Sequence, residues 1–426
     1  MKNRTQTSVN YAKLSAFNYL YKTNQFIMPL IFISVIVTVV TVVQNSSTSF
    51  VAPNPNLNVS SSSSSSTGSA VTSSYATSSS SSSSSDTFDY VIIGAGQSNM
   101  MGYAPGVDPT YDGNIPGVYQ YVIGDQFSRS QTYSGFTISA SEALQDGSNV
   151  NNIGPLYQLS KQFVLQTEHS KVILIQSGIG STTSWQWVVT HLTRSINAAT
   201  ALNATLPNMK VAMIAWLQGE SDSQPNSDPV DYYNNMMTII NRFRTQTPGA
   251  TSTTPFVMVS MVPEEIIGRG EQMIRISNVH RAIPNYVPYT AFRAAPMGMQ
   301  YGCSPTWDRV HYGPTGQRIN GYLFLDAYKQ ALLNTQPFLI PTHPTNVALT
   351  GNSLSWTNTN GTSYALIYRL YQPCNDFNVV KPTILPLTSN PQTISVFTAG
   401  QTYQYDVLAY KNGLHSSQDP IWKLTT

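Results

Sequence analysis

The chain has 426 residues, which is too long for one ordinary domain and predicts two or three folded units. Charged residues make up only 10% of it and the net charge is +2, with no block of Lys and Arg in the part expected to fold, so nucleic-acid binding is not indicated. Two cysteines, Cys303 and Cys374, are too few for a disulfide framework. They form either one disulfide or two free thiols, and the sequence leaves both open.

The first 43 residues predict a membrane anchor. Residues 1–25 contain four basic residues and no acidic one, and residues 26–43 are uncharged and almost wholly apolar. As a helix, this apolar run reaches about 27 Å, close to the hydrocarbon thickness of a bilayer. A cleaved signal peptide is the main alternative, although the run is long and no small-x-small site follows it. We expect a single-pass signal-anchor with a cytoplasmic amino terminus and everything after Val43 extracellular or lumenal.

Residues 44–87 are mostly Ser, Thr and Asn, with an unbroken serine tract from Ser78 to Ser85. Such a segment buries too little apolar surface to offset its chain entropy, so a disordered stalk is predicted. On the exported side, sequons for N-glycosylation begin at Asn45, Asn58, Asn203 and Asn360.

Strand and helix patterns alternate from residue 88 to about 336. Short apolar runs typical of buried parallel strands occupy 88–93, 171–176, 210–217 and 255–262. Helical patterns occupy 155–168, 185–202, 230–246, 271–283 and 313–333. This alternation predicts a three-layer α/β/α domain built on a parallel sheet.

Residues 337–426 change to proline, threonine and short alternating runs. Strands are expected at Ser353–Trp356, Tyr364–Tyr368 and Tyr403–Tyr410, which together predict a small all-β sandwich. The spacing of NVALTGNSLSWT, SYALIYRL and YQYDVLAYKNG resembles a fibronectin type III domain. That resemblance implies a spacer or a binding module.

The stretch DYVIIGAGQSNMMG, residues 89–102, carries the first chemical signal. A buried strand runs into glycines and delivers Ser98 at its carboxyl end, where open α/β sheets place reactive groups. One hypothesis makes Ser98 a nucleophile, and the other makes VIIGAG the start of a dinucleotide-binding loop. Against the second, Asn99 stands where the third glycine is needed, and no strand ending in an acidic residue follows about 20 residues on.

Three later segments favour the nucleophile. QSGIGSTTSW, residues 176–185, follows a strand with glycines that let backbone N–H groups approach a ligand, and WLQGESD, residues 216–222, places Gln218 at another strand end. In WDRVHY, residues 307–312, Asp308 lies three residues before His311, a spacing that lets the aspartate orient the imidazole. A serine, donors at two strand ends and an Asp-x-x-His are the parts that acyl transfer needs.

In their order and wording, GQSNM, IGST, WLQGESD and DRVH resemble the SGNH-hydrolase superfamily, and most closely its sialate O-acetylesterase and carbohydrate acetylesterase branch. The resemblance spans about residues 88–335 and implies a flavodoxin-like sheet and removal of acetyl groups from an acetylated glycan, without a cofactor or metal. Ser98 would be the nucleophile, His311 the general base and then acid, and Asp308 the group that holds the imidazole. The oxyanion hole would comprise the backbone N–H groups of Ser98 and Gly180 and the side-chain amide of Gln218.

Each signal also has a plainer interpretation. Ser98 fits a helix N-cap, His311 fits a surface histidine, and Glu220 and Asp222 fit groups that fix their loop rather than react. Ser181 departs from the Gly-Gly-Thr that family members often carry, which puts the second oxyanion donor in question. The rival functional hypothesis is therefore a surface glycan-binding protein that keeps the fold and has lost turnover. Neither the oligomeric state nor the sugar follows from the sequence.

Overall fold

A computed structural model describes residues 89–113, 115–121, 138–139, 152–263, 270–295, 310–371, 382–417 and 423–425. By its contacts the chain divides after Ser81, and everything below concerns the unit Ser82–Thr426. The predicted cytoplasmic segment (1–25), signal-anchor (26–43) and stalk (44–87) lie outside the described residues, as do Asp308, Cys303 and Cys374.

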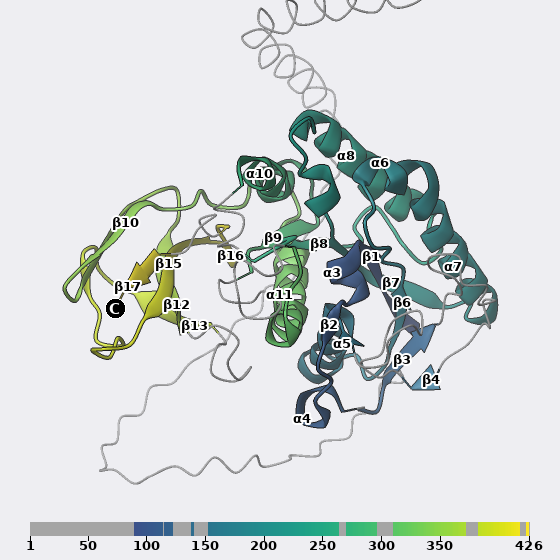
Figure 1. The fold of residues 1–426 in the computed structure, drawn as a ribbon, viewed down its shortest axis with the longest axis horizontal. Helices are drawn as coiled ribbons and strands as arrows, with labels where there is room; N and C mark the ends of the chain where they lie inside the picture. The colour runs from purple at the N-terminus through teal and green to yellow at the C-terminus, as the bar shows by residue number, and fades with distance from the viewer. Residues whose placement is uncertain are drawn as a thin grey trace, which may run out of the picture. The chain divides into compact units, whose positions relative to one another are not determined.

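A seven-stranded sheet forms the centre of the first folded part (Figure 1). Its order is β4 (Ile138–Ser139), β3 (Val118–Tyr121), β6 (Val172–Gln176), β1 (Asp89–Gly96), β7 (Met209–Leu217), β8 (Phe256–Val259) and β9 (Thr290–Arg293). Only β4 is antiparallel to its neighbour, and the other six strands run parallel. The predicted parallel α/β sheet is therefore confirmed.

Helices cover both faces of this sheet (Figure 1). One face packs on α5 (Pro155–Gln166) and α11 (Pro314–Leu333), and the other on α7 (Leu192–Thr205), α8 (Pro229–Gln246) and α10 (Glu271–Tyr286). Strand β1 shows why both faces are apolar. Val91 and Ile93 join the α7–α8–α10 side, whereas Ile92 joins the α5–α11 side, and all three are fully buried. The three predicted layers are present.

The glycines at the end of β1 allow close backbone packing. A Cβ on Gly96, whose φ is 144°, would lie 2.1 Å from the carbonyl oxygen of Leu217 in β7. The next residue, Gln97, donates its N–H to that oxygen at 2.9 Å and caps the short helix α3 (Ser98–Met101). Ser98 is thus the first helical residue and not the N-cap. The close contact with β7 accounts for the glycine without a bound pyrophosphate.

From Thr345 onward the described strands are antiparallel and form two sheets. One sheet holds β10 (Thr345–Thr350), β11 (Ser353–Thr357) and β14 (Gln392–Thr393); the other holds β13 (Thr383–Leu387), β12 (Ser363–Leu370), β15 (Tyr403–Lys411), β16 (Leu414–His415) and β17 (Lys423–Thr425). Side chains from both sheets share one core, for example Leu354 of β11 with Leu366 of β12 and Val407 of β15. Antiparallel sheets after the α/β part were predicted and are found, and the fibronectin type III likeness stays a prediction.

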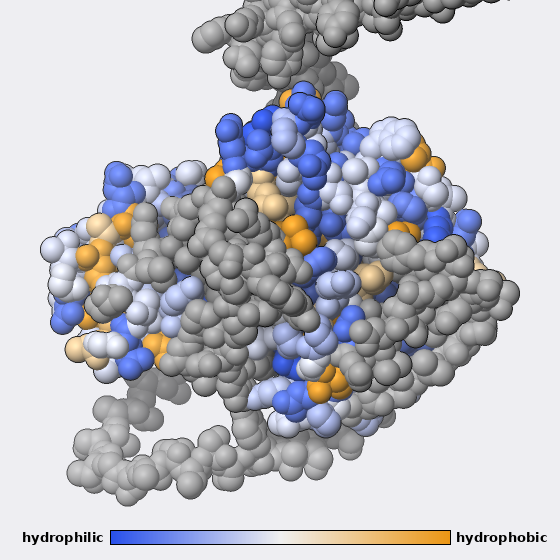
Figure 2. All heavy atoms as spheres, viewed as in Figure 1, coloured by the Kyte–Doolittle hydropathy of each residue, from blue (hydrophilic) through white to orange (hydrophobic). Residues whose placement is uncertain are grey.

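None of the helices in the described ranges is both long enough and apolar enough to cross a bilayer. On the face seen in Figure 2, the described surface over α8 is mostly hydrophilic, and hydrophobic residues are scattered over it.

Candidate active site

The carboxyl ends of β6, β1 and β7 meet at one edge of the sheet, and the loops that follow them pack on α3. The N–H of Ile179, in the loop after β6, donates to the carbonyl of Gly96 at 2.9 Å. In the same loop, a Cβ on Gly178 would lie 2.9 Å from the backbone nitrogen of Met101. Two sequence motifs predicted to act together are therefore in direct backbone contact beside Ser98.

Ser98 and His311 meet at this edge although 213 positions separate them. The Nε2 atom of His311 lies 2.8 Å from Oγ of Ser98, within hydrogen-bonding distance, and both side chains are half-buried. The imidazole stacks on the half-exposed ring of Tyr103, with 4.3 Å between ring centroids and 29° between planes. A serine and a histidine so arranged are the pair that nucleophilic acyl transfer needs.

Asn99 joins this serine turn to three other segments. Three oxygens surround its two amide hydrogens: Glu220 Oε1 at 2.6 Å, the Val310 carbonyl at 2.6 Å and the Met261 carbonyl at 2.9 Å. Its Oδ1 accepts from the N–H of Tyr312 at 3.0 Å. Asn99 is fully buried, and it hydrogen-bonds to the backbone of the residues just before and just after His311. Sequence analysis missed this role.

Glu220 is the carboxyl partner of Asn99, and burial raises its pKa to about 8. Its Oε1 accepts from the Asn99 amide, while its Oε2 is buried without a hydrogen-bond partner among the described residues. Glu220 is therefore protonated at neutral pH. This geometry supports the plainer interpretation of Glu220 as a group that fixes the loop.

The raised pKa of Glu220 predicts a specific pH dependence of stability. Between about pH 4.5, the ordinary value, and about pH 8, the folded protein keeps a proton that the unfolded chain releases, so stability falls as pH rises through this window. Glu220→Gln stays neutral and can still accept from Asn99. From about pH 5 to pH 8, we expect wild type to lose roughly 2–4 kcal/mol more stability than the variant in urea unfolding. Parallel losses in the two proteins would contradict the assignment.

The loop after β6 carries Gly180 and Ser181. Within the described part of the chain, the backbone N–H groups of Ser98 and Gly180 donate to no other group. Ser181 is exposed and has a φ of 58°, so the serine adopts the left-handed conformation that glycine favours. Ser181 stands where family members often carry the second glycine of Gly-Gly-Thr. Its backbone nevertheless adopts the left-handed conformation that a glycine there would adopt.

Ser181→Gly is expected to raise the free energy of unfolding by roughly 0.5–1 kcal/mol, because glycine removes the steric cost of the positive φ. Thermal unfolding compared with wild type measures this gain. Ser223→Gly, at a position with φ of −88°, is the comparison and is expected to lose stability, both from added chain freedom and from loss of the bond that the Ser223 hydroxyl donates to the Gly219 carbonyl. A loss of stability in both variants would show that Ser181 is not strained.

The predicted oxyanion role of Gln218 stays a prediction, and the structure shows what holds its side chain. Its Nε2 donates to the carbonyl of Thr182 at 2.8 Å and to Asp222 Oδ2 at 2.5 Å, and also lies 3.3 Å from Gln97 Oε1. Its Oε1 accepts from the hydroxyl of Tyr232 at 3.0 Å, and the side chain is fully buried. Because both amide hydrogens are engaged, Gln218 fastens the loops after β6 and β7 together.

Asp222 continues this network. It accepts from the hydroxyl of Ser184 at 2.7 Å and from the N–H of the same residue at 2.9 Å, and burial raises the pKa of its carboxyl. On the other side, the Tyr232 hydroxyl lies 2.7 Å from Nε2 of His280, whose pKa burial lowers to about 3. His280 is therefore a neutral, fully buried hydrogen-bonding group.

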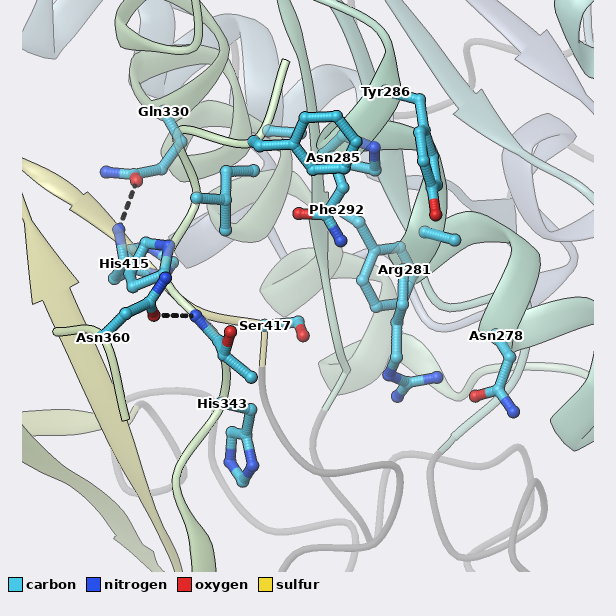
Figure 3. A pocket seen from close by; sticks show the side chains of 17 residues that line it. Asn278, Arg281, Asn285, Tyr286, Phe292, Gln330, His343, Asn360, His415 and Ser417 are labelled. Carbon is cyan, nitrogen blue, oxygen red and sulfur yellow. Dashed lines mark hydrogen bonds between the residues drawn. The ribbon is translucent and has the colours of Figure 1, made fainter. Parts of the chain in front are cut away.

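Two cavities of the described structure include neither Ser98 nor His311 in their linings. One of about 510 Å³ borders Asp222 and the exposed Trp185, next to the loops just described. The other, of about 480 Å³, is lined by α10 and the 338–343 segment (Figure 3). Asn278, Arg281 and Tyr286 lie on one side of it and His343 and His415 on the other. It includes none of the predicted site residues. In the described residues, no group of three or more His, Cys, Asp or Glu is arranged to hold a metal ion.

Comparison with known proteins identifies the family of this chain. The sequence model of one family, described as carbohydrate esterase, sialic acid-specific acetylesterase, matches residues 89–330, more than half of the chain. The chain belongs to this family. The protein is therefore a carboxylic ester hydrolase of the carbohydrate acetylesterase type, and the SGNH-type resemblance seen in its motifs is confirmed.

Solved structures similar to this esterase are related to it distantly. NanS has 16% identity and a TM-score of 0.46, over 57% of this chain and 97% of its own. A protein from Arabidopsis thaliana has 17% identity and a TM-score of 0.45, over 57% and 98%. A carbohydrate acetylesterase from Xanthomonas citri has 15% identity and a TM-score of 0.44, over 79% and 80%. No curated protein matches the chain. The family match alone carries the assignment.

Proposed function

We propose that this esterase removes O-acetyl groups from sugar hydroxyls, on sialate or on a polysaccharide, through an acyl-enzyme on Ser98. The observation that carries the proposal is the 2.8 Å contact between Ser98 Oγ and His311 Nε2 at the carboxyl edge of the sheet. A hydroxyl becomes an effective nucleophile when an adjacent base takes its proton during attack, and this pair is at the distance that such a transfer requires.

In the proposed reaction, Ser98 Oγ attacks the acetyl carbonyl while Nε2 of His311 takes the hydroxyl proton. The imidazolium then gives this proton to the departing sugar oxygen, and an acetyl-Ser98 ester remains. His311 next takes a proton from water, whose oxygen attacks the ester, and acetate and the free serine are released. We propose that Asp308 accepts from Nδ1 of His311 and so holds the tautomer that leaves Nε2 basic.

The negative charge that develops on the carbonyl oxygen needs donors that are in place beforehand. We propose the backbone N–H groups of Ser98 and Gly180, which donate to no other group among the described residues. Each such donor typically supplies about 3 kcal/mol of transition-state stabilisation. The Gln218 amide, engaged with Thr182 and Asp222, is left out of the proposed hole and instead positions its loop.

The test is acetate release from acetylated glycans by the full-length protein in detergent, combined with mass spectrometry of acid-quenched enzyme. An acetyl group is expected on the peptide that contains Ser98 and on no other serine peptide. Acetate release with a label elsewhere would overturn the role of Ser98. A folded protein that releases no acetate from any glycan or from 4-nitrophenyl acetate would overturn the esterase proposal and favour the glycan-binding alternative.

We also propose that residues 26–43 anchor the esterase as a single-pass membrane protein with its catalytic domain extracellular, lumenal or on a particle surface. The support is the length and apolarity of this run in the sequence. Full-length protein is expected to stay with membranes in alkaline carbonate, and a variant lacking residues 26–43 to be released. Release of the full-length chain under the same conditions would contradict the anchor.

A further inference from the structure

The cavity of about 510 Å³ beside the proposed site has one wall of unusual composition. Trp185, on the loop after β6, has 62% of its surface exposed. Its indole makes no hydrogen bond and no ring contact with the described residues. Trp187, two positions on, is instead fully buried and donates its Nε1–H to Thr182 at 3.0 Å. One tryptophan therefore anchors the loop, and the other presents a bare aromatic face to the cavity.

The backbone beneath Trp185 is well fixed. Thr183 and Gln186 form a reciprocal capping box around α6 (Ser184–Gln186), with the Thr183 N–H donating to Gln186 Oε1 at 2.8 Å. Ser184 is held by Asp222, as described above. An exposed tryptophan on a fixed backbone has only two side-chain torsions to order on binding, which suits stacking against the face of a sugar ring.

The opposite wall comes from the start of α8 and carries polar groups. Asp228 caps the helix by accepting from the N–H of Val230 at 2.8 Å. Asp231 is exposed and makes no hydrogen bond or ion pair with the described residues. Asn235 donates to the Ser184 hydroxyl at 3.0 Å, and Asn234 is exposed. Carboxylates and amides of this kind accept hydrogen bonds from sugar hydroxyls.

Charge decides which sugars this cavity accepts. Two exposed aspartates, Asp228 and Asp231, line it beside the partly buried Asp222, whose pKa burial raises, and no Lys, Arg or His is among its described lining residues. Arg275 donates to the carbonyl of the lining residue Ser227 at 3.4 Å. A carboxylated sugar such as a sialate would meet like charge there, whereas an uncharged sugar would not. Like-charge repulsion at an exposed site weakens with salt, so this discrimination is measurable as an ionic-strength dependence.

The cavity is connected to the reacting edge through two short paths. Its lining residue Asp222 accepts from Gln218, which in turn lies 3.3 Å from the side chain of Gln97, the residue before the serine. Along the loop, Trp185 is five residues after Gly180, so at full extension about 18 Å of chain separates them. The cavity thus shares the loops after β6 and β7 with the proposed site, so the ligand to test is a sugar next to the acetylated one in the same glycan chain.

We propose that this cavity is a glycan subsite that binds an uncharged sugar of the substrate chain by stacking on Trp185, and that it selects neutral polysaccharide over sialate. The proposal rests on the proposed esterase function, because the bound sugar is part of a substrate only if the protein removes acetyl groups from that glycan. Binding to the cavity itself does not require turnover, and the experiment uses this separation.

The experiment titrates full-length Ser98→Ala protein in detergent with xylotetraose, mannotetraose, chitotetraose and the anion sialyllactose, followed by calorimetry and tryptophan fluorescence. At least one neutral tetrasaccharide is expected to bind more tightly than sialyllactose and to change the fluorescence. Adding Trp185→Ala is expected to weaken this binding about tenfold or more. Trp185→Phe keeps a stacking ring, so most of the affinity is expected to return while the fluorescence change is lost.

Tyr286→Ala is the matched control, because Tyr286 lines the other cavity and is 53% exposed. This variant is expected to bind the neutral tetrasaccharide as tightly as the parent. Asp231→Asn is expected to strengthen sialyllactose binding at low salt. The proposal is overturned if no neutral tetrasaccharide binds, if sialyllactose binds as tightly, or if Trp185→Ala and Tyr286→Ala weaken binding equally. Binding without acetate release by wild type would overturn the esterase proposal alone, and release without binding the subsite alone.

Discussion

Ser98→Ala is expected to lower kcat for hydrolysis of acetate esters by about 10⁴-fold or more. The proposed reaction forms its only covalent bond to the enzyme at Ser98 Oγ, and alanine has no atom that can replace it. Removal of the hydroxyl is expected to leave the fold intact, because among the described residues this hydroxyl hydrogen-bonds to the half-buried His311 alone. KM reports mainly on sugar and acetyl contacts that remain, so we expect it to change much less than kcat.

The measurement is initial-rate hydrolysis of 4-nitrophenyl acetate and of an acetylated glycan by full-length protein. Ser170→Ala is the matched control, because Ser170 is exposed just before the amino end of β6, whereas the site lies at the carboxyl end. If Ser98 and His311 act as one unit, the double variant Ser98→Ala/His311→Ala will be about as slow as either single variant. Multiplicative losses, or a Ser98→Ala protein near wild-type activity, would refute the pair.

Asn99→Ala is expected to lower the free energy of unfolding by about 3 kcal/mol or more, and kcat by about 100-fold. The substitution removes one hydrogen bond each from the buried carbonyl of Met261, the half-buried carbonyl of Val310 and the N–H of Tyr312. Buried polar groups without partners are costly, and the backbone on both sides of the proposed base is then free to shift. A displacement of about 1 Å at the base is enough for the expected loss of rate.

Urea unfolding and steady-state kinetics measure the two effects separately. Asn208→Ala, at an exposed turn, is the matched control and is expected to change neither. A positioning role predicts that kcat falls while KM stays within about threefold, since Asn99 does not reach the substrate. A variant that is destabilised but retains wild-type kcat would limit Asn99 to folding.

Long segments with a clear period were predictable from the sequence. The helices at 155–166, 229–246 and 314–333 and the strands at 172–176 and 209–217 lie within one to three residues of their predicted bounds. Strand β9 was missed because it has only four residues, Thr290–Arg293, and includes Ala291, a weak strand former. Strand β10 was missed because its apolar positions alternate weakly among exposed residues.

Site residues that lie in a sequence motif could be predicted, whereas contacts between distant segments could not. Ser98 and His311 were paired from sequence motifs alone, and the structure brings them within hydrogen-bonding distance. Asn99 was beyond reach, because its partners lie 121 to 213 positions away and no local pattern marks them. Gln218 was placed correctly at a strand end. Its amide lies within hydrogen-bonding distance of three acceptors, on Gln97, Thr182 and Asp222, and no local sequence pattern marks these contacts.

The hydrogen bonds of Asn99 also affect how the site responds to temperature and denaturant. They join the end of β1, the loop after β7, the segment after β8 and the residues that flank His311. Among the described residues, these four segments cannot separate without exposing buried polar groups of the core. We therefore expect the reacting edge to open mainly together with the α/β fold and not by itself. Heat inactivation of this esterase should follow loss of the whole α/β fold and not precede it.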